Sequence, residues 1–124
     1  MLKIRADQMD ALSNAAVVTF EQRVAAHLRR FFPDACQRLN DAGLLERIRY
    51  GISIAATYGI VTECGVCKYI DVMFTLGWQF DCDPQLPWAH EILIDDSVED
   101  SALRVGSLCD AVEYYIASQS PNED

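Results

Sequence analysis

The stretch "GISIAATYGIVTECGVCKYIDVMFTLG", residues 51–77, decides the fold because it contains the end of one helix and the start of the next. Gly59 is the residue type that most often closes a helix, since glycine adopts a left-handed backbone without steric cost. Thr62 can then accept a hydrogen bond as the N-cap of a new helix, and Glu63 favours its first turn. A helix is therefore expected over 63–79, with its buried face formed by Val66, Tyr69, Ile70, Met73, Phe74 and Gly77.

The helix that Gly59 closes is expected to cover about 42–58. Its apolar side chains recur at helical spacing; they are Leu44, Leu45, Ile48, Ile52, Ala55 and Ala56. Gly51 lies inside this helix, where a glycine costs about 1 kcal/mol relative to alanine. Gly51 is therefore expected to mark a close crossing of two helices.

Two further helices are expected nearer the N-terminus. A long helix over 5–32 is predicted from its apolar spacing, and Pro33 stops it because the residue before a proline avoids the α region. A short helix over 34–40 follows. The apolar stripe of the long helix consists of Met9, Leu12, Ala16, Phe20, Val24, His27, Leu28 and Phe31.

The chain after residue 79 predicts a loop, a short helix and one more long helix. Segment 80–90, "FDCDPQLPWAH", contains two prolines and two aspartates, which is typical of a loop or turn. Pro87 can open a short helix over 87–94. A last helix is expected over about 100–118, with the apolar positions Leu103, Leu108, Val112, Tyr115 and Ile116.

Together these segments predict an all-α fold, a single-domain bundle of five to six helices, two or three of them long. No stretch shows the apolar–polar alternation of period two that is typical of strands. The domain is expected to span 1–119, followed by a disordered acidic tail at 120–124. A chain of 124 residues that is 51% hydrophobic can bury a core without staples such as disulfides or metals.

The formal net charge of −9 argues against a nucleic-acid partner, because phosphates would be repelled. This charge is unevenly distributed along the chain. Residues 1–60 carry eight Lys/Arg and six Asp/Glu, a net of +2, whereas residues 61–124 carry two and thirteen, a net of −11. Two interpretations stay open: the halves attract one another, or the acidic half offers a surface to a basic partner protein.

The N-terminal sequence "MLKIRADQMD" is charged within its first ten residues and lacks the apolar core of a signal peptide. No apolar run approaches the roughly 18 residues of a membrane-spanning helix. We therefore expect a cytoplasmic protein with no membrane partner. Because that compartment is reducing, structural disulfides among the five cysteines are not expected.

Cys64 and Cys67 form a Cys-x-x-Cys pair at a predicted helix N-terminus, a spacing that thiol–disulfide enzymes and zinc sites use. The redox motif normally follows a strand, whereas a helix end and a turn are predicted before Thr62. A zinc site needs four ligands, and the other three cysteines are isolated from one another. The favoured interpretation is structural, with Cys67 packed in the helix and Cys64 a surface thiol, so no catalytic residue, metal ligand or cofactor is predicted.

Five residues are singled out as candidate interaction residues. Trp88, beside Pro87, either packs its loop on the core or anchors a partner, because tryptophan and tyrosine are enriched at interface hot spots. The aspartates of the 80–90 loop resemble the opening of a calcium loop, but the glycine and the final carboxylate that such a loop needs are missing. The candidates are Trp88, Asp81, Asp83, Tyr58 and Tyr69.

Several segments together resemble a family of small bacterial proteins whose genes lie beside type VI secretion spike or effector genes. The matching residues are "IRADQMDAL", "FEQRVAAHLRRFFP", "RIRYGISIAATYGIVTE", "VCKYIDVMFTLGWQFD" and "PQLPWAHEIL", within residues 4–94. The resemblance implies an accessory protein that helps to load an effector or acts with an adaptor chaperone. It attaches no catalytic residue to any position of this chain.

The sequence therefore predicts a non-enzymatic protein–protein interaction module, an accessory or co-chaperone for a type VI secretion effector or its adaptor. The expected partner is another protein, an effector, an adaptor chaperone or a toxin, with a basic surface; self-association is compatible with the sequence. One alternative is an immunity protein that neutralises a toxin. A less favoured alternative is a small thiol-redox or metal-binding protein that uses Cys64 and Cys67.

Overall fold

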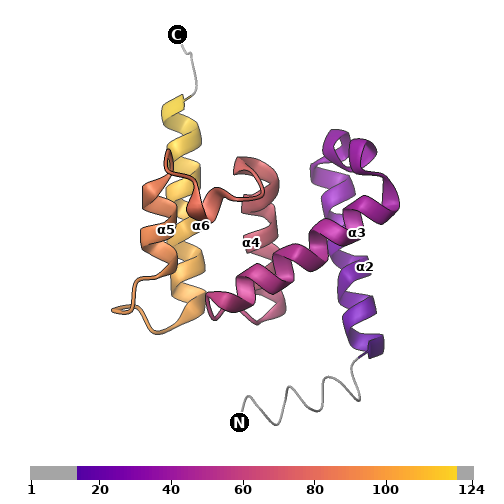
Figure 1. Ribbon diagram of the computed structural model, residues 1–124, viewed down its shortest axis with the longest axis horizontal. Helices are drawn as coiled ribbons and strands as arrows, with labels where there is room; N and C mark the ends of the chain where they lie inside the picture. The colour runs from indigo at the N-terminus through magenta and orange to yellow at the C-terminus, as the bar shows by residue number, and fades with distance from the viewer. Residues whose placement is uncertain (1–13, 120–124) are drawn as a thin grey trace. The chain divides into compact units, whose positions relative to one another are not determined.

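The computed structural model describes residues 14–119, with side chains from residue 18 onward. These residues form five α-helices and one 3-10 turn and contain no strand, which confirms the predicted all-α bundle of five to six helices. Figure 1 shows the elements in order: α2 (Asn14–Phe31), α3 (Pro33–Thr57), α4 (Glu63–Leu76), η1 (Phe80–Cys82), α5 (Pro87–Leu93) and α6 (Ser101–Gln119).

Two compact units make up the described chain, one ending at Arg49 and the other beginning at Tyr50, within α3. The single domain expected over 1–119 stays a prediction. The first part of the helix predicted over 5–32, with Met9 and Leu12, lies outside the described residues, and so does the tail predicted at 120–124. None of the described helices combines the length and the hydropathy needed to cross a bilayer.

In the first unit, α3 is interrupted at Asn40, whose φ of 57° lies in the left-handed region. Asparagine adopts a positive φ more often than most residue types other than glycine. Its side-chain oxygen accepts a hydrogen bond from the backbone N–H of Gly43 at 3.0 Å, which caps the arm of α3 that follows. The two helices predicted over 34–40 and 42–58 are therefore present as the two arms of α3.

A paired charge accompanies the buried apolar side chains of the first unit. Glu21 is only 5% exposed, and its two carboxylate oxygens accept hydrogen bonds from Nε and Nη2 of Arg49 at 3.0 and 3.2 Å. These bonds raise the pKa of Arg49 and satisfy the buried carboxylate. The buried apolar side chains on α2 and on this arm of α3 include Val24, Leu28, Leu44 and Ile48.

The C-terminal end of the apolar stripe predicted for the first helix is exposed. Phe31 is 59% exposed, whereas Val24 and Leu28 of the same stripe are buried. It is the last residue of α2, and its ring lies beside the His27 ring, with centroids 4.9 Å apart. Periodicity alone could not show that the buried stripe stops one turn before the helix does.

The turn between α3 and α4 follows from caps at both of its ends. Gly59 has φ 77°, its N–H donates to the carbonyl of Ala56, and the N–H of Ile60 donates to the carbonyl of Ala55. These two bonds satisfy carbonyls that the end of α3 leaves unpaired. Thr62 then accepts a hydrogen bond from the N–H of Gly65 at 3.0 Å, so both predicted caps are confirmed.

Gly51 lies where α3 crosses α4 within the second unit. A Cβ atom at this position would stand 2.7 Å from Cγ1 of Ile70 and 3.1 Å from Sδ of Met73. Both distances are shorter than ordinary van der Waals contact. The prediction that Gly51 marks a close helix crossing is therefore confirmed.

α4 ends at Leu76, three residues before the end predicted for it. Gly77 adopts φ 123°, and its N–H donates to the carbonyl of Met73, so the glycine ends the helix and does not contribute to its buried face. The chain then enters η1, whose Phe80 is fully buried. Pro87 opens α5 as predicted.

The remaining elements of the second unit pack in pairs. α5 contacts η1 and α6, and α4 also contacts α6, so α6 packs against both of these helices (Figure 1). The buried residues of α6 are Val105, Leu108 and Val112, at spacings of three and four. Leu103 and Ile116, two of the apolar positions noted for the predicted last helix, are 63% and 46% exposed and lie outside this buried face. Leu103 lies two residues before Val105, about 200° around the helix, and therefore faces away from the core.

Candidate functional site

Two of the five candidate interaction residues form a hydrogen bond beside η1. The hydroxyl of Tyr58, just after α3, donates to a carboxylate oxygen of Asp81 at 2.7 Å. Nδ1 of His90, on α5, donates to the backbone carbonyl of Asp81 at 3.1 Å. Asp81 therefore ties the end of α3 and the middle of α5 to the 3-10 turn between them.

Tyr69 belongs to the same cluster but is a core residue. It is 0% exposed, and its ring centroid lies 5.1 Å from that of Phe80 and 6.3 Å from that of Tyr58. No hydrogen-bond partner for its hydroxyl is found within the part of the chain that the structure describes. Its selection as an interaction residue is corrected, because a fully buried ring offers no surface to a partner.

The two tyrosines are expected to respond in opposite directions to loss of the hydroxyl. Tyr58→Phe removes a bond to a charged acceptor and should lower the free energy of unfolding by about 1–2 kcal/mol. Tyr69→Phe removes a buried hydroxyl that has no partner and should raise it by about 1 kcal/mol. Urea denaturation of the two variants beside the parent measures both changes. A loss of stability in Tyr69→Phe would show that its hydroxyl is satisfied.

A fall in stability at alkaline pH is also expected. Burial raises the pKa of both Tyr58 and Tyr69, so above pH ~10 the unfolded chain releases phenolic protons that the folded chain retains. Because the unfolded state then binds fewer protons, stability decreases as pH rises, by up to about 1.4 kcal/mol per pH unit for buried Tyr69. Solvent screening makes the share of the half-buried Tyr58 smaller.

Denaturant titrations between about pH 8 and 11 measure this fall. Burial also raises the pKa of Cys67 and of Cys109. The fall in stability should therefore begin at about pH 9, where the thiols of the unfolded chain lose their protons. The double variant Tyr58→Phe/Tyr69→Phe should show a shallower slope above pH ~10 than the parent. An identical slope in the two proteins would contradict this assignment.

The other two candidates have local roles and stay partly exposed. A carboxylate oxygen of Asp83 accepts a hydrogen bond from the backbone N–H of Gln85 at 2.8 Å, which shapes the turn before α5. Trp88 packs against Tyr115 of α6, with ring centroids 5.5 Å apart. Trp88 therefore holds α5 against α6, as the packing interpretation predicted, and is only half-buried.

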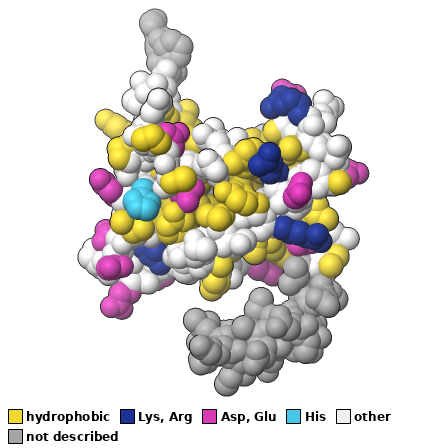
Figure 2. Space-filling view, viewed as in Figure 1, with side chains coloured by type: hydrophobic (Ala, Val, Ile, Leu, Met, Phe, Trp, Pro, Cys, Tyr) yellow, Lys and Arg dark blue, Asp and Glu magenta, His cyan; other side chains and the backbone are white. Residues whose placement is uncertain are grey.

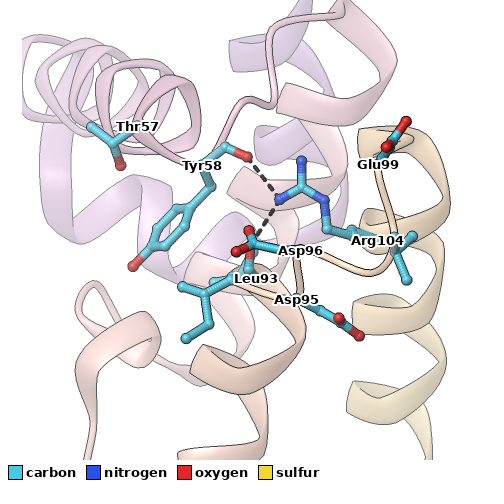
Figure 3. A pocket seen from close by; sticks show the side chains of 9 residues that line it. Thr57, Tyr58, Leu93, Asp95, Asp96, Glu99 and Arg104 are labelled. Atoms are coloured by element: carbon cyan, nitrogen blue, oxygen red, sulfur yellow. Dashed lines mark hydrogen bonds between the residues drawn. The ribbon is translucent and has the colours of Figure 1, made fainter.

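A pocket of about 450 Å³ lies in the second unit, where the ends of α3 and α5 meet the start of α6 (Figure 3). Nη1 of Arg104 donates to the backbone carbonyl of Tyr58 at 2.9 Å and to that of Leu93 at 2.7 Å. Both carbonyls belong to helix C-termini, where intrahelical partners are missing. Figure 3 shows the guanidinium between these two carbonyls, so a single side chain joins three helices.

The rest of the pocket is acidic with an apolar wall. The wall consists of Leu93, Ile94 and Val98, and the carboxylates are Asp95, Asp96 and Glu99. Ser97 donates its hydroxyl and its N–H to Asp95, which lowers the pKa of that carboxyl. The lining holds three carboxylates and one guanidinium, so the pocket suits a cationic or hydrogen-bond-donating group better than an anion.

Cys64 and Cys67 lie on the first turns of α4 as two free thiols. Cys64 is exposed, as expected for a surface thiol, and Cys67 is half-buried. Burial raises the pKa of Cys67, with smaller contributions from Asp71 and Cys64. A reactive thiolate needs the opposite shift, so the burial of Cys67 and its raised pKa favour the structural interpretation of this residue.

Sequence reasoning missed Arg104 as the centre of this pocket. Its acceptors are 46 and 11 residues away along the chain, so no local motif marks it. The one available signal was its isolation, because it is one of only two basic residues after residue 60. Comparison with protein-family models, with curated proteins and with solved structures finds no match for this chain.

Proposed function

We propose that this chain is a non-enzymatic protein–protein interaction module, an accessory or co-chaperone for a type VI secretion effector or its adaptor. The observation that carries the proposal is the charge of the second unit. Its described residues, 50–119, include eleven Asp/Glu and two Lys/Arg, a net of −9. One of the two cations, Arg104, is engaged with backbone carbonyls, so carboxylates dominate the charged side chains of the unit that a partner can reach.

The distribution of charge over the surface supports a basic partner. On the face shown in Figure 2, acidic side chains gather over α5 and the loop that follows it. Most Lys and Arg side chains of the described residues belong instead to α2 and to the part of α3 that ends at Arg49. An acidic surface accelerates encounter with a basic protein and disfavours acidic competitors.

Exposed apolar side chains within the acidic unit support a binding role as well. Large apolar side chains that remain in water favour association when a partner covers them. Those of the second unit are Val61, Ile94, Leu103, Tyr114 and Ile116, exposed by 46–78%. The resemblance to proteins encoded beside secretion genes supports the assignment to an effector or adaptor, acting in the cytoplasm.

Co-purification tests the proposal. The tagged chain, produced from its own locus in the native host, is expected to retain the product of a neighbouring gene, and deletion is expected to lower the amount of secreted effector. The matched control is the same tag on a charge-neutralised chain with Asp96→Asn, Glu99→Gln and Asp110→Asn, which should retain less. Recovery of the chain alone, with effector secretion unchanged after deletion, would refute it. Rescue of growth from a co-expressed toxin would support an immunity protein instead.

A further inference from the structure

α6 has a solvent-facing side that carries its own pattern. Leu103, Gly106, Asp110 and Tyr114 are spaced by three and four residues and therefore share one side of the helix, here called the outer face of α6. Leu103 is 63% exposed and Tyr114 is 78% exposed. The opposite side holds the buried Val105, Leu108 and Val112. The apolar side chains at the two ends of the outer face therefore play no part in the core.

Gly106 lies between these two apolar side chains and has no packing function within the described chain. A Cβ atom built on it would meet no other atom within 4 Å. A glycine inside a helix disfavours folding relative to alanine, and Gly51 shows the usual compensation, a close approach of neighbouring atoms. At Gly106, a close approach of this kind would have to come from atoms outside the described residues, such as those of a partner. The position is suited to the backbone of a second helix.

The charges on this side of α6 are acidic. Asp110 belongs to the outer face and Glu113 flanks it, one turn further on. Neither carboxylate makes a hydrogen bond or an ion pair with any residue that the structure describes. Both remain available to cations of a partner, and Leu103 and Tyr114 supply apolar contact about 16 Å apart along the helix.

We infer that the outer face of α6 docks a basic amphipathic helix of the partner protein. The inference rests on the proposed function and names the surface and the chemistry of the partner. Apolar side chains of the incoming helix pack on Leu103 and Tyr114, its backbone crosses at Gly106, and its Lys or Arg side chains pair with Asp110 and Glu113. Tyrosine is among the residue types that contribute most to binding at interfaces, so Tyr114 is the main anchor.

A second copy of this chain is disfavoured as the occupant. Two outer faces packed against one another would bring Asp110 and Glu113 close to the same carboxylates of the other copy. Like charges at such a distance oppose association. A basic helix removes this repulsion, which is why the proposal commits to a basic partner.

The test uses a synthetic helix of about 21 residues, three heptads, with Leu and Ala at positions a and d and Lys at e and g. Calorimetry with the full chain measures its affinity, and ¹H–¹⁵N spectra locate it. Binding is expected to shift the amide signals of α6. Tyr114→Ser should weaken binding about tenfold or more. Gly106→Ala should weaken it severalfold although it raises the melting temperature, because alanine favours the helix and obstructs the approach.

Two controls make the result specific. Ile116→Ser changes another exposed apolar residue of α6, about 200° away from Tyr114, and should leave affinity within about twofold. A peptide with Glu in place of Lys should not bind. The proposal is overturned if the basic peptide does not bind, if Ile116→Ser weakens binding as much as Tyr114→Ser, or if the chain forms a dimer that Tyr114→Ser abolishes.

Failure of this inference is distinguishable from failure of the proposed function. If a partner co-purified from the host is retained equally by the parent and by Tyr114→Ser, the outer face is wrong and the interaction function stands. If the parent retains no partner, the proposed function fails. If Tyr114→Ser loses the partner and keeps its melting temperature, both proposals are supported.

Discussion

Arg104→Met is expected to lower the free energy of unfolding by about 2–4 kcal/mol, because two charge-assisted hydrogen bonds to backbone carbonyls are lost. Methionine keeps much of the aliphatic volume, so the change isolates the guanidinium. The carbonyls of Tyr58 and Leu93 would then lack their donor at the ends of α3 and α5. Guanidinium denaturation, with the midpoint and slope compared, measures the loss.

Two further variants show whether the geometry or the charge of Arg104 matters. Arg104→Lys keeps the positive charge, but its side chain is one bond shorter, so its ammonium should not reach the position of Nη1 between the two carbonyls and should recover less than half of the loss. Lys68→Met removes the other cation of the second unit from an exposed position on α4 and should change stability by less than about 0.5 kcal/mol. Equal losses in Arg104→Met and Lys68→Met would attribute the effect to net charge.

Gly51→Ala is expected to destabilise the protein by about 1–2 kcal/mol, although alanine is the better helix former. The new methyl group would stand 2.7 Å from Cγ1 of Ile70 and 3.1 Å from Sδ of Met73, so the cost of overpacking should lie in the upper part of its usual range, about 2–3 kcal/mol. This cost exceeds the gain of about 1 kcal/mol in helix propensity. Gly51→Leu enlarges the conflict and should cost about 3 kcal/mol or prevent folding. Thermal denaturation followed by circular dichroism measures both variants.

Gly106→Ala is the matched control for this prediction. Its Cβ would meet no atom within 4 Å, so the propensity gain is unopposed and the protein should become about 1 kcal/mol more stable. The same chemical change in two helices of one protein should therefore have opposite signs. A stabilising Gly51→Ala would show that α3 and α4 separate readily at their crossing.

The elements that could be predicted from the sequence are those that local chemistry determines. Gly59 and Thr62 are caps whose partners lie within four residues of them, and the structure shows the bonds that their residue types predict. Pro87 opens α5 for the same kind of reason. Gly51 could be interpreted because a glycine inside a strong helix needs a compensating contact, and α4 provides it.

The features that escaped prediction depend on tertiary packing. In α6, Leu103 and Val105 both belong to apolar patterns with helical spacing, and only the positions of α4 and α5 decide which of them is buried. Tyr69 resembled an interface residue because its residue type is common there, whereas its neighbours enclose it completely. No local motif marks Arg104, because its two acceptor carbonyls come together only after three helices have met.

The closely spaced caps between α3 and α4 also bear on the order of folding. The connection from Gly59 to Thr62 is short, so the entropy lost on closing it is small, and the crossing at Gly51 can form early. The contacts of Arg104 span 46 residues and should form only after the main barrier. A chain with Arg104→Met should therefore fold at nearly the parent rate and unfold faster, so that the arginine sets the lifetime of the folded state.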